Sequence, residues 1–178
     1  TTSYYTLNAP ADITAGGARA AYTVSRFDVY DNPVTSGAEV VYLYTSSTGL
    51  AAGFYDAVAN GNQVTQVTIA DGSSTANVWY YDEESGAWTI TASDATPATD
   101  GATGVDDDTD VLTVLPATTS YFFLNAPADI TAGGARAGYT VSRFDVYDNP
   151  VTSGAEVVYL YTSSTGLAAG FYDAAANG

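Results

Sequence analysis

Hydrophobic and polar residues alternate in short runs along most of this chain. Within residues 39–44, Val41 and Leu43 fall on one side of an extended backbone, and Val40, Tyr42 and Tyr44 fall on the other. Other runs rich in Val, Tyr, Thr and Ile are separated by clusters of Gly, Asn, Asp and Ser, which favour turns. We therefore predict strands at residues 3–7, 20–30, 38–46, 53–56, 63–70, 74–82, 87–93 and 110–115.

Strands of this length with turns at regular intervals are typical of an all-β, two-sheet sandwich. The alternation also predicts which side chains face the interior: Val67 with Ile69, Val78 with Tyr80, and Trp88 with Ile90. Trp88 opens its strand and is predicted to anchor the core. Residues 94–109 lack alternation and are predicted to form a loop.

The chain repeats itself over a long period. Residues 118–178 restate residues 1–61 at an offset of 117, with four differences: Tyr5/Phe122, Thr6/Phe123, Ala21/Gly138 and Val58/Ala175. A period of this length corresponds to a whole domain rather than to a solenoid unit. We expect residues 1–117 to form a complete domain and residues 118–178 to be the first half of a second one.

Half of a sandwich exposes a hydrophobic face and unpaired strand edges. One interpretation is that residue 178 marks a cut through a longer repetitive protein. The alternative is that a neighbouring molecule completes the half-domain by strand donation or swapping. In a sharper form of that alternative, residues 62–117 and 118–178 form a permuted domain, which leaves residues 1–61 in need of a partner.

Several segments carry a resemblance to a known family. Ile-Thr-Ala-Gly-Gly at 13–17, Tyr-Thr-Val-Ser-Arg-Phe-Asp at 22–28 and Asn-Pro-Val-Thr-Ser-Gly at 32–37 resemble the bacterial immunoglobulin-like (Big-type) repeats of long surface proteins and adhesins. Residues 67–74 and 88–93 are similar to the same repeats. The resemblance implies tandem immunoglobulin-like sandwiches, secretion, and a role in adhesins, surface fibres or cell-wall proteins. It brings no catalytic residues.

Charge and composition exclude several classes of function. The formal net charge is −16, from 20 acidic residues against four arginines and no lysine. Without a basic patch, binding to nucleic acid or to an anionic membrane surface is excluded, and no apolar run approaches the ~20 residues of a membrane span. The chain also has no His, no Cys and no Lys, so no Ser/His/Asp, Cys/His or lysine centre can form, and we expect that this protein is not an enzyme. Absence of Cys and Met suits an exposed extracellular protein.

Acidic residues form two groups that could hold a cation. Asp106, Asp108 and Asp110 alternate like the first ligands of a helix-loop-helix calcium site, but Val111 and Ala117 break that motif. In an immunoglobulin-like topology this loop lies at the same pole as the turn containing Asp31. We place the second group at the opposite pole, with members Asp12, Asp82, Glu83 and Glu84.

Stacked domains would bring the two acidic groups together across each junction, where they would repel unless a cation lay between them. We therefore hypothesise Ca²⁺ at interdomain junctions. The alternative is that solvated acids simply keep the fibre soluble.

Aromatic side chains on outward faces offer a second kind of site. Val40, Tyr42 and Tyr44 recur in the second copy, and a further row lies on a neighbouring strand; the set comprises Val40, Tyr42, Tyr44, Trp79, Tyr81, Val157, Tyr159 and Tyr161. These rows are interpreted as lateral interfaces between fibres or protomers, where Tyr and Trp are favoured. The alternatives are stacking on carbohydrate, or an inverted assignment in which a row belongs to the core.

Arg26 and Arg143 are lone cations in the second predicted strand of each copy. We predict that each makes an internal ion pair or hydrogen bonds with an acid such as Asp28 or Glu39.

Together these features predict a structural protein of the cell exterior. It would be a tandem immunoglobulin-like repeat of a fibre, filament or cell-surface stalk, assembling end to end with its own kind and using strand complementation between neighbours. The alternative is an adhesin repeat that binds a glycan or a host surface through exposed Tyr and Trp. Neither hypothesis involves nucleic acid or insertion into a membrane.

Overall fold

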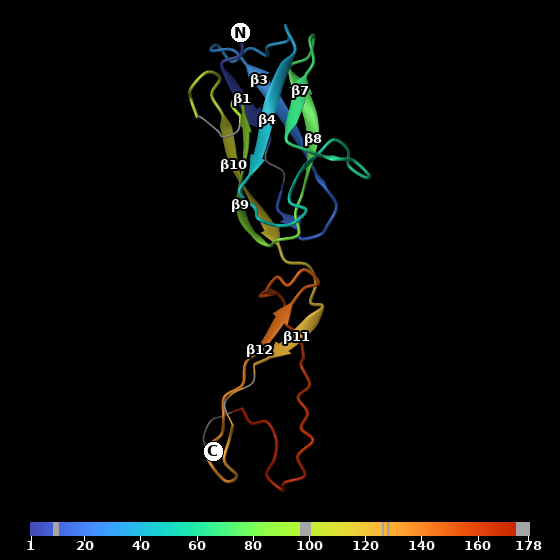
Figure 1. Cartoon of the computed structure of the whole chain (residues 1–178), viewed down its shortest axis with the longest axis vertical. Coiled ribbons are helices and arrows are strands. Elements are labelled where there is room, and N and C mark those ends of the chain that lie inside the picture. Colours follow the sequence, from blue (N-terminus) through green and yellow to red (C-terminus); the bar gives the residue numbers. More distant parts are fainter. Residues whose placement is uncertain (9–10, 97–100, 126, 128, 174–178) are drawn as a thin grey trace. The chain divides into compact units, whose positions relative to one another are not determined.

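A computed structural model of the chain describes residues 1–8, 11–96, 101–125, 127 and 129–173. It contains two compact units, Thr1–Ala117 and Thr118–Gly178, shown in Figure 1. We call them the first unit and the second unit.

The first unit is an immunoglobulin-like sandwich of two five-stranded sheets, which confirms the predicted all-β fold class. One sheet has the order β1-β3-β8-β5-β6, with bounds Tyr4–Leu7, Ala20–Phe27, Thr75–Tyr81, Gly53–Tyr55 and Gln63–Val64. The other has the order β2-β10-β9-β4-β7, with bounds Ile13–Thr14, Asp108–Leu115, Gly86–Ser93, Glu39–Thr45 and Gln66–Ile69.

The core lies between the sheets and follows the alternation of the sequence. Val41 and Leu43 of β4 are buried, and Val40 on the opposite side of that strand is exposed, as predicted. Val78 and Tyr80 of β8 are likewise buried. The centre of the core is aromatic, where the rings of Tyr22, Phe54 and Tyr80 meet edge to face. The alternation of the sequence therefore correctly predicted which side chains of β4 and β8 face the interior.

The start of the chain is divided between the two sheets. β1 pairs antiparallel with β3, and the two-residue strand β2 crosses to the other sheet and pairs parallel with β10. β2 was not predicted from the sequence, because two residues carry no periodicity. As a result, β10 runs beside both β1 and β2, and Figure 1 shows the N-terminus at one end of this unit and the end of β10 at the other.

Two predicted strands were wrong in their limits. The strand predicted at 63–70 is two strands, β6 and β7, that belong to different sheets. The strand predicted at 20–30 ends at Phe27, because the Asp28 carboxylate accepts hydrogen bonds from the backbone N–H groups of Tyr30 and Asn32 and folds the chain into a turn.

Two further details differ from the sequence analysis. Trp88 is only partly buried: it packs against the core, and its indole N–H donates to the Glu84 carbonyl at 2.9 Å. The final strand starts at Asp108 rather than at residue 110, which shortens the predicted loop at 94–109; residues 97–100 of that loop lie outside the described residues.

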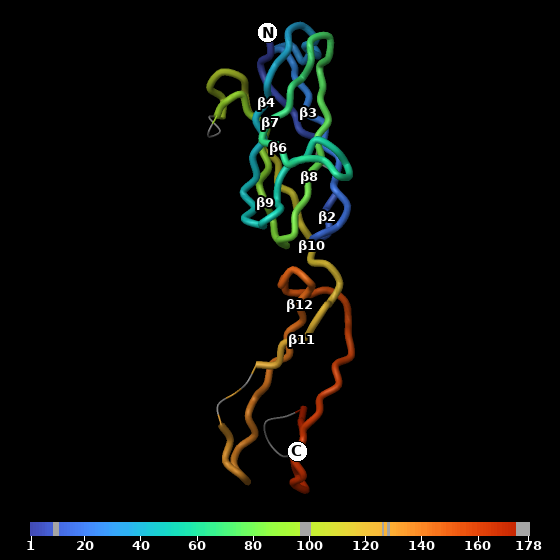
Figure 2. Tube along the Cα trace, turned by 45° about the vertical axis from the view of Figure 1, so that its right-hand side comes forward, coloured from blue at the N-terminus to red at the C-terminus, as the bar shows by residue number. Residues whose placement is uncertain are grey.

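The second unit retains only part of this architecture. Its strands β11 (Tyr121–Leu124) and β12 (Val141–Phe144) pair antiparallel in the register of β1 with β3. Within its described residues, the counterparts of β2, β4 and β5 are not strands. Figure 2 shows residues 151–173 as an extended orange-to-red trace. Leu160 is 44% exposed, whereas its counterpart Leu43 is 4% exposed.

Candidate functional site

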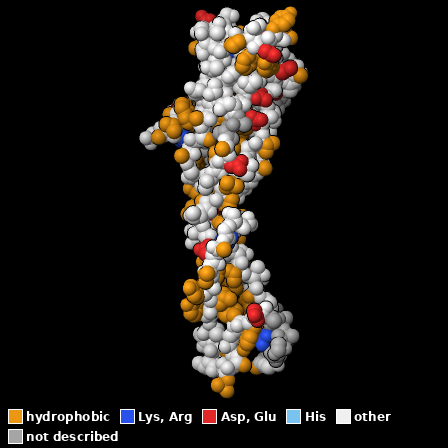
Figure 3. All heavy atoms as spheres, turned by 180° about the vertical axis from the view of Figure 1, so that it is seen from behind, with side chains coloured by type: hydrophobic (Ala, Val, Ile, Leu, Met, Phe, Trp, Pro, Cys, Tyr) orange, Lys and Arg blue, Asp and Glu red, His pale blue; other side chains and the backbone are white. Residues whose placement is uncertain are grey.

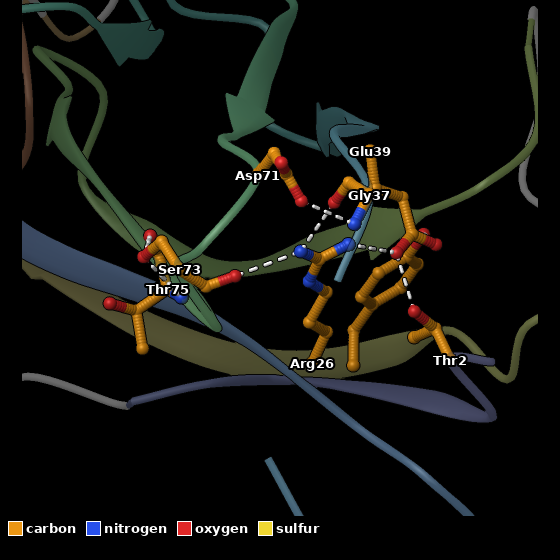
Figure 4. A network of polar contacts seen from close by, with 8 residues as sticks. Thr2, Arg26, Gly37, Glu39, Asp71, Ser73 and Thr75 are labelled. Atoms are coloured by element: carbon orange, nitrogen blue, oxygen red, sulfur yellow. Dashed lines mark hydrogen bonds and ion pairs between the residues drawn. The ribbon is translucent and has the colours of Figure 1, made fainter. Parts of the chain in front are cut away.

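A buried arginine connects the two sheets at the end of the first unit where the chain starts (Figure 4). Arg26 follows Tyr22 and Val24 on the inward face of β3, so its side chain enters the interior. Its Nη1 lies 2.9 Å from Glu39 Oε2, on the first residue of β4 in the opposite sheet. Its Nη2 donates to the carbonyls of Gly37 at 2.6 Å and Ser73 at 2.8 Å. The predicted internal ion pair is thus confirmed, with Glu39 and not Asp28 as its acid.

Further hydrogen bonds converge on the Glu39 carboxylate. It accepts from the hydroxyl of Tyr5 at 2.9 Å and from that of Thr2. Burial acts to raise the pKa of Glu39, but these hydrogen bonds and the Arg26 guanidinium outweigh it and lower that pKa. Conversely, burial and the hydrogen bond to Glu39 raise the pKa of Tyr5, which keeps its hydroxyl a donor. Glu39 therefore remains an anion held between the sheets.

A second polar link joins the sheets near the other end of β4. The Tyr80 hydroxyl of β8 donates to Asp82 Oδ2 at 2.9 Å. The hydroxyl of Thr45, the last residue of β4, lies 2.7 Å from the Tyr80 hydroxyl. Burial raises the pKa of Tyr80, which preserves that proton. Asp82 is 1% exposed and also accepts from the Glu84 N–H. We call these two groups the Arg26 clamp and the Tyr80 clamp.

The terminal segments of the first unit are joined directly to each other. At one end, Asp106 N donates to the Ser3 carbonyl at 2.9 Å and Tyr5 N donates to the Asp106 carbonyl at 3.1 Å. At the other end, Ala15 N donates to the Leu115 carbonyl at 2.8 Å, beside the parallel pairing of β2 with β10. Leu7 N also donates to the carboxylate of Asp108. The first and last segments thus run in the same direction, in contact along the sandwich.

Of the acidic residues singled out from the sequence, Asp31 and Asp106 lie at one end of the first unit and Asp82 lies at the other, whereas Asp108 and Asp110 lie within β10. Tyr4 bridges to Asp106 through its backbone and donates from its hydroxyl to Asp31, which places both acids at the start of β1. Gly16 N donates to the Asp82 carbonyl, so Asp82 lies at the end where β2 finishes. Asp12 is exposed nearby in sequence.

Several of these acids already have partners inside the unit. Asp82 belongs to the Tyr80 clamp, and Glu83 and Glu84 accept from the hydroxyls of Tyr81 and Thr48. Asp108 and Asp110 share the inward face of β10 with Leu112, and burial together with the charge of Asp108 raises the pKa of Asp110.

Among the described residues, no three His, Cys, Asp or Glu side chains come together as a metal site. The hypothesis of Ca²⁺ between domains concerns a junction and stays a prediction.

The outward aromatic residues have mixed environments. Tyr42, Tyr44, Trp79 and Tyr81 are half-buried. The Tyr44 hydroxyl donates to the Ala95 carbonyl at 2.6 Å, and the Tyr81 ring meets the Tyr55 ring edge to face. In the second unit, the counterparts Val157, Tyr159 and Tyr161 are exposed. Their role as an interface stays a prediction.

The ion pair of Arg26 was predicted from the sequence and the Tyr80 clamp was not, although both continue an inward series of side chains. Arg26 continues the inward series of Tyr22 and Val24, and Asp82 continues that of Val78 and Tyr80. A charged residue at an inward position requires a buried partner. Asp82 is bonded by Tyr80, only two residues before it, whereas the partner of Arg26 is Glu39, 13 residues away on a strand of the opposite sheet, which alternation does not reveal.

Comparison with known proteins gives a likeness of architecture. No family model and no curated protein sequence matches this chain. Similar solved structures include a glycosyl hydrolase family 2 member from Bacteroides cellulosilyticus, with 12% identity and a TM-score of 0.43 over 66% of this chain and 14% of that one. Another is surface layer protein SbsC, domains 4-9, with 18% identity and a TM-score of 0.43 over 85% of this chain and 21% of that one.

This chain thus corresponds to a small part of either protein. The likeness concerns the β-rich architecture alone. Within the described part of the chain, no helix is long and apolar enough to cross a membrane. Statements about function therefore depend on this chain's own residues.

Proposed function

We propose that this chain is a structural repeat of an extracellular fibre, filament or cell-surface stalk, and that its first unit transmits tension along the fibre. The observation that carries the proposal is the arrangement of the terminal segments. The first and last segments of the unit are parallel and hydrogen-bonded, and the unit begins at one end of the sandwich and finishes at the other.

This arrangement determines how the unit responds to force. Tension applied between Thr1 and Ala117 pulls β1 and β2 against β10 along their length, so the hydrogen bonds between them are loaded together. Strands pulled apart from one end would instead lose their bonds one at a time, at lower force. The Arg26 and Tyr80 clamps add resistance, because sliding one sheet past the other would separate the buried Arg26 from Glu39 and the Tyr80 hydroxyl from Thr45.

Composition supports a position outside the cell and association with like molecules. The net charge of −16 keeps a concentrated array soluble, and the absence of Cys and Met leaves no thiol or thioether to oxidise. Successive units are joined by the short segment 116–118, which favours end-to-end assembly. If carboxylates at facing ends bind Ca²⁺, chelation will lower the rigidity of the assembly.

Single-molecule pulling of the whole chain tests the proposal. With handles at Thr1 and Ala117, we expect one cooperative unfolding event that releases about 400 Å of chain for the 117 residues of the first unit. A control places the handles at Glu83 and Ala117, which lie at the same end and unzip the strands. The end-to-end geometry should require a several-fold higher force.

Equal forces in the two geometries would contradict a tension-bearing role. Binding of the folded chain to members of a glycan array, with loss of that binding in the Trp79→Ala variant, would favour the adhesin alternative instead. Trp79 is the residue to replace, because its side chain is partly exposed on an outward face and could contact a glycan.

A further inference from the structure

The loop between β5 and β6 is exposed at its tip and closed at its base. Figure 1 shows it projecting from the side of the first unit, and Figure 3, seen from behind, shows it standing clear of the body of that unit. Asp56 N donates to the Asn62 carbonyl at 3.1 Å, and Asn62 N donates to Asp56 Oδ1 at 2.7 Å. Between these two residues, Asn60 is exposed to solvent and is followed by Gly61.

An asparagine followed by a glycine can modify its own backbone. The glycine nitrogen attacks the side-chain carbonyl carbon of the asparagine, which produces a five-membered imide and releases ammonia. Glycine favours this attack because it has no Cβ atom to crowd its nitrogen. The asparagine carboxamide and the glycine N–H must both be free to move, so a hydrogen bond at either group slows the reaction.

Both reacting groups are free at Asn60 and Gly61. The Gly61 carbonyl accepts from Arg19 Nη2 at 3.3 Å, but this bond does not involve its nitrogen. Within the part of the chain that the structure describes, neither the Asn60 carboxamide nor the Gly61 N–H makes a hydrogen bond. The two groups can therefore approach each other without first breaking a described hydrogen bond.

A second pair of the same kind has the opposite arrangement. Asp71 and Gly72 can form the same imide, with loss of water in place of ammonia. Here, however, Asp71 Oδ1 accepts from Gly37 N at 2.7 Å, and Gly72 N donates to the Thr35 carbonyl at 2.7 Å. Both reacting groups are held, so this pair is a control within the same unit. Two further pairs, at 100–101 and 177–178, include residues outside the described ranges.

The other described asparagines lack at least one requirement. Asn32 and Asn149 are followed by proline, which has no N–H to attack. The side chains of the remaining four are hydrogen-bonded, and none of the four precedes glycine: Asn8, Asn62, Asn77 and Asn125. Sequence and structure therefore agree on Asn60 as the reactive position of the described chain.

We propose that Asn60 is a site of spontaneous modification, at which attack by Gly61 N converts the asparagine to aspartate or isoaspartate. A bond forms between Gly61 N and Asn60 Cγ, the bond from Cγ to Nδ2 breaks, and the proton of Gly61 N leaves with ammonia. Water then opens the imide. Opening at Cγ gives aspartate, and opening at the main-chain carbonyl carbon gives isoaspartate, whose backbone runs through Cβ.

The products change the contacts of the loop. Either product adds a carboxylate to a chain whose net charge is already −16, and isoaspartate lengthens the backbone between the two ends of the loop by one carbon. Arg19 holds the loop at the carbonyls of Ala57 and Gly61 and lies 3.6 Å from the centre of the Tyr55 ring. A longer backbone displaces the Gly61 carbonyl, so the loop and the adjoining two-residue strand β6 should open more often.

This inference does not depend on the tension-bearing role, because β5 and β6 lie at the far side of their sheet from β1. Modified chains should therefore keep the unfolding force of the end-to-end geometry.

The test incubates the whole chain, folded and in urea, at mildly alkaline pH in water enriched in ¹⁸O. Opening of the imide places a solvent oxygen at residue 60 or 71, so peptide mapping by mass spectrometry reads both pairs in one experiment. At Asn60 the folded rate should lie within about threefold of the unfolded rate, because an exposed loop opens at little cost. At Asp71 it should be at least about tenfold lower, because two hydrogen bonds must break first. A folded rate at Asn60 reduced as far as that at Asp71 would overturn the proposal.

Asn60→Gly is the matched variant. Asn60 has a φ of 57°, in the left-handed region that glycine adopts without strain, so the variant should keep the loop. Gly61→Ala is unsuitable, because its Cβ atom would lie 2.5 Å from Asp56 Oδ1. Amide exchange at Gln63 and Val64 of β6 should rise during incubation of the parent chain and stay constant in Asn60→Gly. The same rise in both chains would contradict the proposed effect on the loop.

Discussion

The two units of this protein show one sequence in two environments. In the first unit, Leu43 lies in the core and β4 is paired on both sides; in the second, Leu160 is exposed and the same residues form no strand. Contacts between residues close in sequence are present in both: the Tyr4–Phe27 and Tyr121–Phe144 ring pairs stack with centroid distances of 5.3 and 5.4 Å. Local structure therefore forms without residues 62–117, and the remaining sheet structure does not.

The two arginines sharpen this comparison. Arg26 is buried and 2.9 Å from Glu39, whereas Arg143 is 3.5 Å from Glu156 and partly exposed. Arg26 also donates to the carbonyl of Ser73, which belongs to residues 62–117. Arg143 donates instead to the nearby carbonyls of Ser153 and Gly154. The arginine is therefore buried and clamped where residues 62–117 cover the repeat, and it forms a more exposed, longer ion pair in the second unit.

The largest expected effect comes from removing this arginine. Arg26→Ala leaves the Glu39 carboxylate and two carbonyls without their partner, so the free energy of unfolding of the first unit should fall by about 3–5 kcal/mol. Denaturant unfolding followed by tryptophan emission measures this, because Trp79 and Trp88 both belong to the first unit. Arg143→Ala is the matched control and should leave the midpoint unchanged. Similar losses from both variants would contradict the comparison.

A core leucine gives the next largest effect. Leu43→Ala should lower the free energy of unfolding of the first unit by about 2–5 kcal/mol, because it opens a cavity between the sheets. Leu160→Ala removes the same atoms from an exposed position and should change nothing in that transition. The same unfolding measurement compares the two, and an unaffected Leu43→Ala variant would show that this part of the core is not tightly packed.

A glycine near the Tyr80 clamp should give a smaller effect. A Cβ atom on Gly49 would lie 2.7 Å from Asp82 Oδ1, whereas one on Gly166 has its nearest neighbour at 3.6 Å. Gly49→Ala must displace a buried carboxylate, so we expect a loss of about 1–3 kcal/mol. Gly166→Ala should be silent in the first unit's transition. A silent Gly49→Ala would mean that the clamp adjusts without cost.

The pH dependence of stability should reveal the smallest effect. The pKa of Glu39 is lowered in the folded state, so its contribution is present above its ordinary pKa and is lost as pH falls through the lowered value. The stability difference between the parent chain and Glu39→Gln should therefore shrink between about pH 6 and pH 2. Urea unfolding across this range measures it. A constant difference would show that the folded-state pKa of Glu39 is not lowered.

Particular residues show how far the sequence could predict the fold and the site. Alternation correctly predicted the buried faces of β4 and β8, because each residue's side of a strand depends only on the strand itself. It missed β2 and joined β6 to β7, because a two-residue strand and a crossing between sheets carry no period. The lone cation Arg26 was predicted to pair with a nearby acid, but the choice of Glu39 over Asp28 depended on the opposite sheet.

The sequence by itself determined the turns, the inward and outward side of each residue, and the local contacts that both units share. Only the tertiary structure decided that residues 39–45 form a strand with a buried face and that the identical residues 156–162 do not. Leu43 and Leu160 have the same neighbours in sequence, yet only Leu43 has strands on both sides of it and a second sheet above it. The physical reason is that burial depends on the surface that covers a residue, and in this protein that surface comes from residues 62–117.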